Sequence, residues 1–325
     1  MIGGVRLDLM VAGFSSTVSS IMSWNDFINF KIILLSIVIE AFPFLILSVM
    51  VSAMLSHFVS ENRIRSMLPN NKFLSLIMAC FLGILFPVCD CGMVPIVRRL
   101  VLKGVPLPTA IVFMLAAPII NPVVGAATAF AFRNHIDVVF LRLGAAFFVA
   151  LFAGLFINFF FIGNQLKKAG EIHSHQGCCH DTTGSHLIEL SFLNKIIFTF
   201  RDASNEFFEM GKFLLIGAML GSLSQVLLPH AMLLTLGQNS FLSTGFMMLF
   251  AFFISVCSSA DAFIAASFNT TFSLGSLITF MVLGPMIDLK NLLMLLYTFR
   301  TRFVIWLALM IILLCSSAAY VINHF

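Results

Sequence analysis

Two cysteines separated by a single aspartate interrupt an apolar stretch of the chain. Within residues 86–123 the sequence reads Cys89, Asp90, Cys91, Gly92. Two thiols at this spacing can chelate or react with a soft metal or metalloid, because thiolates prefer soft ions. An acid in the middle of a bilayer is costly and is therefore usually retained for function or paired. These residue types predict a substrate site at this interruption.

A second version of the motif follows about 168 residues later, the offset between Cys89 and Cys257. Each copy is a polar break in an apolar run, and a proline break follows each about 28 residues on. A duplicated pair of broken hydrophobic segments is a pointer to a transporter's substrate site. The further residues predicted to contact substrate are Pro118, Asn121, Cys257, Ser258, Ser259, Asp261, Pro285 and Asp288.

The composition requires a membrane. Hydrophobic residues make up 60% of the 325 positions and charged residues only 10%, whereas a soluble domain carries about 25% charged residues. Several apolar runs exceed the roughly 18 residues needed to cross a bilayer. The basic residues lie at the ends of these runs, so the net charge of +4 does not indicate a nucleic-acid partner.

The apolar runs divide the chain into four parts. We expect an N-terminal extension (1–29), a first membrane repeat (30–163), a cytoplasmic linker rich in His and Cys (164–199) and a second membrane repeat (200–325). The 25 N-terminal residues lack the pattern of a cleavable signal peptide and are expected to remain on the protein. No phosphate-binding GxxxxGK[ST] loop is present, so the chain is not expected to hydrolyse ATP through such a loop.

Loop charge favours inverted repeats. With the N-terminus outside and each Cys-bearing segment forming a re-entrant hairpin, all basic residues face the cytoplasm except Arg6, Lys31, Arg133 and Arg142. This agrees with the positive-inside rule. The predicted fold is an all-α polytopic membrane protein with two inverted repeats, each with three crossing helices and one re-entrant helical hairpin bearing a Cys-containing break. A model in which every apolar run crosses fully remains the alternative.

Further polar residues are candidates for ion coupling or metal binding. Glu40 and Glu209 occupy matching positions in the two halves and are expected nearer the ends of their spans, as coupling candidates alongside Asp90, Asp261 and Asp288. The linker contains soft-metal ligand types, although a solvated linker with incidental histidines is equally compatible. These predicted metal ligands are His173, His175, Cys178, Cys179, His180 and His186.

The stretches PVCDCGMVPIVRRLVLKGVPLPTAIVFMLAAPIINP, SVCSSADAFIAA and GPMIDLKNLLML resemble the predicted bacterial permeases that include the YraQ-like proteins and the organoarsenical efflux permeases of the ArsP type. The resemblance extends from about residue 32 to the C-terminus. It implies a polytopic inner-membrane permease and, by similarity to the arsenical branch, export of trivalent organoarsenicals. In that branch a small residue is expected between the two cysteines, so Asp90 is a departure.

The leading hypothesis is a secondary-active permease that exports a soft metal or thiol-reactive metalloid compound. Its expected partners are that small-molecule or metalloid substrate and the lipid bilayer, with a homo-oligomer left open; no cofactor and no nucleic acid are expected. A channel or importer for a small anion is the first rival. An intramembrane dithiol redox protein is the second, although no HExxH motif or clear nucleophile–base pair supports an enzyme.

Overall fold

The computed structural model describes residues 24–58, 69, 71–85, 90–133, 135–160, 192–227, 240–269 and 271–324. Throughout these ranges the regular elements are helices, as predicted. The first half of the chain contributes α2 (Trp24–Phe58), α4 (Lys72–Leu85), α5 (Asp90–Leu102), α6 (Leu107–Ala116), α7 (Pro122–Ala131) and α8 (Ile136–Phe160). The second half contributes α9 (Phe192–Leu227), α11 (Ser240–Ile254), α12 (Ala260–Ser267), α13 (Leu274–Met286), α14 (Leu289–Thr298) and α15 (Thr301–His324).

Five segments of the described chain are long and apolar enough to cross a membrane. They are Phe27–Met54, Ile136–Phe160, Thr199–Val226, Leu274–Thr298 and Thr301–His324. The apolar run at 105–132 is not among them, because it is divided into two ten-residue helices, α6 and α7. Many phenylalanines on the long helices are exposed in the isolated chain, which suits contact with lipid.

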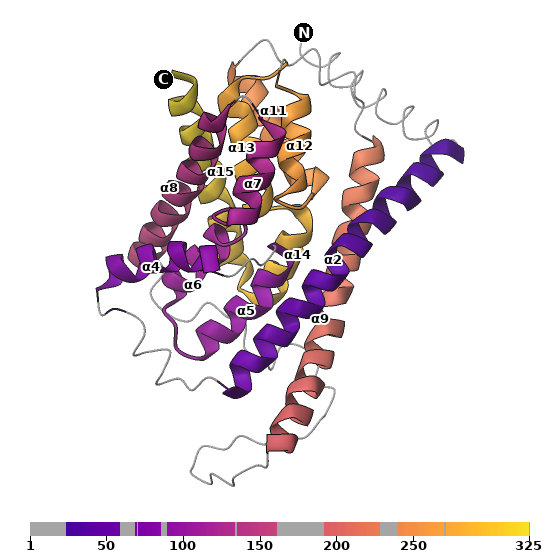
Figure 1. The fold of residues 1–325 in the computed structure, drawn as a ribbon, viewed down its shortest axis with the longest axis vertical. Helices are drawn as coiled ribbons and strands as arrows, with labels where there is room; N and C mark the ends of the chain where they lie inside the picture. The colour runs from indigo at the N-terminus through magenta and orange to yellow at the C-terminus, as the bar shows by residue number, and fades with distance from the viewer. Residues whose placement is uncertain are drawn as a thin grey trace, which may run out of the picture.

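The order of elements in the two halves is the same. Each half has a long first helix, two shorter helices flanking the Cys-bearing break, two more flanking the proline-containing break, and a long last helix. In Figure 1 the two first helices, α2 and α9, lie side by side and run in opposite directions. This arrangement agrees with an inverted duplication, which remains a prediction. The predicted part boundaries differ slightly from the helices, since α2 begins inside the extension and α9 inside the linker.

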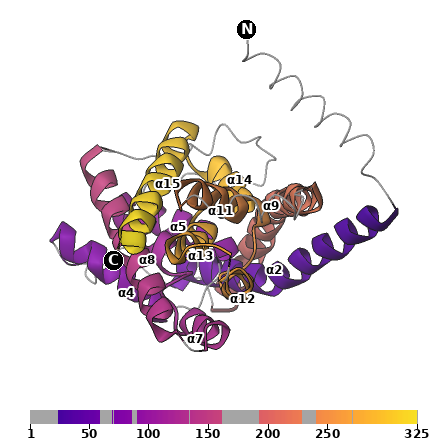
Figure 2. The ribbon, with the colours of Figure 1, turned by 90° about the horizontal axis from the view of Figure 1, so that it is seen from above.

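Helix α13 lies at the centre of the bundle. Its candidate span, together with α14, is 83% buried within the chain, whereas that of α2 is only 22% buried. Seen from above in Figure 2, α13 is surrounded by other helices while α2 and α9 stand together at one side. The central helix and the peripheral pair therefore belong to different environments, one of protein and one largely of lipid.

The two proline-containing breaks end in similar helix caps. Pro118 lies in the turn after α6, and Pro285 is the last residue but one of α13. Asn121 then caps α7 by accepting a hydrogen bond from the Val123 amide at 2.9 Å. Asp288 caps α14 by accepting one from the Asn291 amide at 2.6 Å. An Asn or Asp at this position accepts a hydrogen bond from one of the amides that a helix start leaves unpaired. A new helix therefore begins directly after each break.

Candidate functional site

A buried cluster of three charges joins the second motif to the first. The ammonium of Lys290 lies 3.3 Å from Asp90 Oδ2 and 3.1 Å from Asp288 Oδ2. Asp90 is the first residue of α5, and Asp288 caps α14, so both acids lie at helix N-termini, where negative charge is favoured. All three side chains are at most 4% exposed. The fold thus places acids from both halves around one lysine.

The break between α11 and α12 supplies the remaining contacts of the lysine. The backbone carbonyl of Ser255 accepts a hydrogen bond from Lys290 Nζ at 2.9 Å, and its hydroxyl donates one to Asp288 Oδ2 at 2.8 Å. Ser255 has a φ of 51°, in the left-handed region that few non-glycine residues adopt. This conformation costs energy and persists only where surrounding contacts hold it. The carbonyl and the hydroxyl of Ser255 both bond to the charge cluster.

Helix α9 approaches this cluster closely at a glycine. A Cβ added to Gly217 would lie 2.6 Å from the Cα and Cβ of Lys290. Only a residue without a side chain fits there, so Gly217 lets α14 pack directly on α9.

A small pocket lies beside the charge cluster. Its volume is about 20 Å³, which is enough for about one water molecule. Two thiols, two carboxylates and the lysine ammonium contribute to the wall. The lining residues are Ile37, Glu40, Ala41, Phe44, Asp90, Cys91, Ser255, Cys257 and Lys290.

Glu40 reaches this pocket from the middle of a span. The prediction that it lies near the end of its span is wrong, because the candidate span of α2 runs from Phe27 to Met54. The same holds for Glu209, which lies near the middle of Thr199–Val226. Glu209 does not line the pocket; its Oε2 lies 3.9 Å from Arg98 Nη1.

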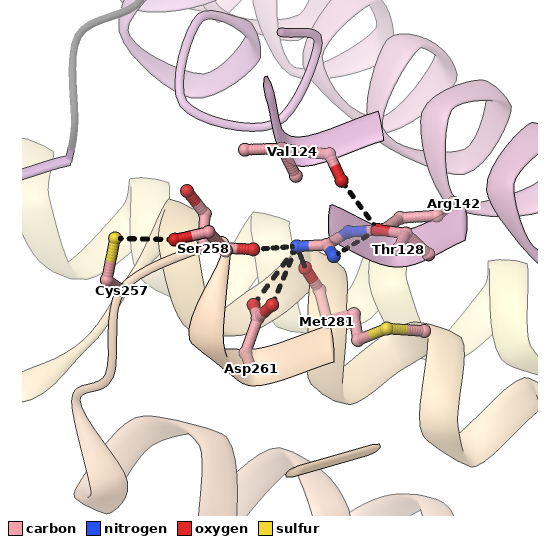
Figure 3. A network of polar contacts seen from close by, with 8 residues as sticks. Val124, Thr128, Arg142, Cys257, Ser258, Asp261 and Met281 are labelled. Carbon is pink, nitrogen blue, oxygen red and sulfur yellow. Dashed lines mark hydrogen bonds and ion pairs between the residues drawn. The ribbon is translucent and has the colours of Figure 1, made fainter. Parts of the chain in front are cut away.

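A second ion pair forms elsewhere in the core. Arg142 of α8 donates to both oxygens of Asp261 at 2.9 and 3.1 Å, and also to the carbonyl of Ser258 at 2.8 Å (Figure 3). It donates further to Thr128 Oγ1 at 2.8 Å and to the Met281 carbonyl at 3.2 Å. Arg142 is 1% exposed. It therefore joins four elements, α7, α8, α12 and α13, around the end of the second break.

Two assignments of basic residues to loops are wrong. Arg142 was expected outside and Lys290 on the cytoplasmic face, but both side chains are buried and paired with acids. Neither charge can report on loop orientation. The sequence held a signal for each: Arg142 interrupts an apolar run, and Lys290 stands two residues after Asp288. Asp90 lies in the other half of the chain from Lys290, and Asp261 in the other half from Arg142, so spacing alone could not identify these two partners.

The predicted site residues therefore fall into separate groups. Asp90, Cys91, Cys257 and Glu40 share the pocket, and Asp288 adjoins it through Lys290. Ser258 and Asp261 contact Arg142, while Ser259 Oγ lies 3.5 Å from the Cys257 sulfur. Four other residues lie outside the pocket lining, in helices or at their ends: Gly92, Pro118, Asn121 and Pro285.

Several predicted ligands lie outside the described residues. Cys89 is one, and the others are His173, His175, Cys178, Cys179, His180 and His186. Within the part of the chain that is described, no group of three or more His, Cys, Asp or Glu side chains is arranged to hold a metal ion. Metal binding by the linker stays a prediction.

Broken helices with buried charges at their ends, in an all-helical chain with several apolar spans, define a multi-pass membrane protein of the transporter class. Residues 26–324 match the model of a family described as predicted permease, ArsP_1, and the chain belongs to that family. This family relationship indicates a transporter.

Two curated relatives agree with this assignment. The chain is 43% identical to the UPF0718 protein YcgR of Bacillus subtilis (strain 168), over 92% of this chain and 98% of that protein. It is 37% identical to a putative two-component membrane permease complex subunit of Streptococcus mutans, over 84% of this chain and 88% of that protein. No solved structure gives a significant match.

Proposed function

We propose that this protein is a secondary-active permease of the bacterial inner membrane that exports a soft metal or a thiol-reactive metalloid compound, coupled to a proton or cation. The family relationship supports transport. The observation that carries the choice of cargo is the pocket that Cys91 and Cys257, from the two halves of the chain, both line. Thiols are the protein ligands that soft ions and trivalent metalloids prefer.

The charge around the pocket favours this cargo over an anion. Glu40 and Asp90 line it, and Asp288 lies just behind Lys290, so three carboxylates face one ammonium. A net negative charge of this kind repels anions and raises the local concentration of cations. The Lys290 ammonium lines the pocket but is already paired with Asp90 and Asp288, which disfavours the rival proposal of a small-anion channel or importer.

The position of the acids also narrows the coupling candidates. Asp90 and Glu40 line the pocket, and Asp288 is one ion pair away. Asp261 instead meets the Arg142 guanidinium with both of its oxygens. We assign coupling to the pocket acids and a structural role to Asp261.

A resistance assay tests the cargo proposal. Cells lacking the gene are complemented with the wild-type chain or with Cys89→Ser, Cys91→Ser or Cys257→Ser, and exposed to phenylarsine oxide, silver and cadmium ions. The wild type is expected to restore growth against at least one agent, and each variant to lose that resistance at an equal membrane level. Cys315→Ser is the matched control, because Cys315 is buried in α15 away from the pocket.

The rivals have different outcomes in the same system. Full resistance in all three cysteine variants would refute the thiol contact and favour the anion proposal, which predicts flux independent of these cysteines. A dithiol redox protein would instead show a Cys89–Cys91 pair whose oxidation state cycles during turnover, measured by alkylation of trapped thiols.

The lipid bilayer surrounds the long helices, and a homo-oligomer is a further part of the proposal. The exposed apolar side chains of α2 and α9 offer a surface for a second copy or for lipid. Native mass spectrometry of the protein released from nanodiscs distinguishes the two, since a second copy doubles the mass of the particle.

A further inference from the structure

The two carboxylates paired with Lys290 differ in how many hydrogen bonds they accept. Asp288 accepts hydrogen bonds from the Asn291 amide and the Ser255 hydroxyl in addition to its ion pair. Asp90 has the ion pair with Lys290, but neither of its carboxylate oxygens accepts a hydrogen bond from any described residue. A buried carboxylate without hydrogen bonds is costly, so Asp90 gains most from any further positive charge.

The pocket gives such a charge access to Asp90. Asp90 is 1% exposed, yet it lines the pocket beside Glu40 and Cys91. A volume of about 20 Å³ admits one water-sized group. A proton carried by water or a bare sodium ion fits this volume.

Lys290 occupies the place that an external cation would take. Its ammonium is tethered to α14 and contacts two carboxylates and the Ser255 carbonyl, which are the oxygen donor types that bind hard cations. If a cation binds Asp90 from the pocket, the ammonium keeps Asp288 and Ser255 as partners. The lysine can therefore leave Asp90 without being left buried and unpaired.

We propose that Asp90 is the site of the coupling cation and that Lys290 is its tethered competitor, so that Asp90 holds either the ammonium or one proton or sodium ion from the pocket. This inference rests on the proposed permease function and adds Lys290 to the coupling machinery. Exchange between the two states changes the attraction between α5 and α14, the helices that carry Asp90 and Lys290. Cation binding at Asp90 is thereby linked to the packing of α5 against α14.

The other charged and titratable groups near Asp90 come from several elements of the described chain, among them Asp261 of α12, which is paired with Arg142. Helix α2 presents Glu40, α14 presents Asp288 and Lys290, and the second break presents Cys257. Helix α9 presents Glu206, but its Oε2 lies 3.3 Å from Arg99 at the far end of α5. The direct competitor of a cation at Asp90 is Lys290.

The test is a charge-movement measurement on purified protein in liposomes without any cargo. A step in proton or sodium concentration is applied on a solid-supported membrane, and the transient current is recorded against concentration. The wild type is expected to give a saturable transient with one of the two cations, and Asp90→Asn to give none. Matched controls are Asp137→Asn and Lys31→Gln, which change exposed residues away from the pocket and should behave as wild type.

Removing the competitor provides the second arm. Lys290→Gln should keep the transient and lower the half-saturating cation concentration by about 10- to 1,000-fold, the effect of removing one close opposite charge. Lys290→Arg should restore a value near that of the wild type. A purely structural lysine would instead reduce the amplitude with no shift in half-saturation.

Several outcomes would overturn the inference. They are an undiminished transient in Asp90→Asn, no transient in the wild type with either cation, or an unshifted half-saturation in Lys290→Gln. Thermal unfolding of each variant in detergent shows whether it is folded, and the Lys290 arm decides the matter if Asp90→Asn is not. Because no cargo is used, failure here leaves the cysteine-dependent resistance assay as a separate test of the permease proposal.

Discussion

Replacing Arg142 with methionine tests how far the buried ion pair holds the core together. The guanidinium is 1% exposed and donates to Asp261, to the carbonyls of Ser258 and Met281, and to Thr128. Methionine fills much of the volume but leaves the Asp261 carboxylate as an unpaired buried charge. Breaking one partner of a buried pair costs about 3–5 kcal/mol.

The free energy of unfolding is measured by SDS titration of the purified protein in mixed micelles. The expected loss corresponds to a change of roughly 10²- to 10⁴-fold in the unfolding equilibrium constant. Arg133→Met is the matched control, because Arg133 is exposed in the turn after α7, and it should unfold like the wild type.

A double variant separates the charge from the packing. Arg142→Met combined with Asp261→Leu removes both charges and should return to within about 2 kcal/mol of the wild type, since a buried pair is often no better than apolar replacements. The reasoning is refuted if Arg142→Met is as stable as Arg133→Met, or if the double variant is as unstable as the sum of its two single changes.

Three further predictions concern helix packing and caps. Gly217→Val should destabilise the protein by about 1–3 kcal/mol because its side chain would collide with Lys290; Gly245→Val, at a position with open space, is the control, and equal stabilities would contradict the close approach. Asp288→Asn keeps a capping oxygen on α14 but loses the ion pair, whereas Asp288→Ala loses both. In thermal unfolding the alanine variant should therefore be about 1 kcal/mol less stable than the asparagine variant. Equal stabilities of the two variants would show that the cap contributes nothing. Asn121→Ala should cost about 1 kcal/mol through the cap of α7 and Asn121→Asp much less, and an alanine variant as stable as the wild type would exclude that cap.

Much of the architecture follows from the chain's own pattern. Apolar run length predicted the all-helical membrane protein, and the polar break at Cys257 and the turn at Pro118 interrupt helices as expected. The apolar run through residues 105–132 forms two helices, α6 and α7, because a proline follows the first helix and a capping asparagine starts the second. Local chemistry was readable because caps and breaks act within a few residues.

The partners of the buried charges were not readable. The sequence alone determined that acids and thiols stand at two similar breaks in apolar runs, since residue type and spacing are local properties. Only the tertiary structure decided that Lys290 pairs with Asp90 across 200 residues of chain and that Arg142 forms an ion pair with Asp261. Neutralisation of a buried charge depends on which helices pack together, so two basic residues that looked like loop markers became the counter-ions of the core.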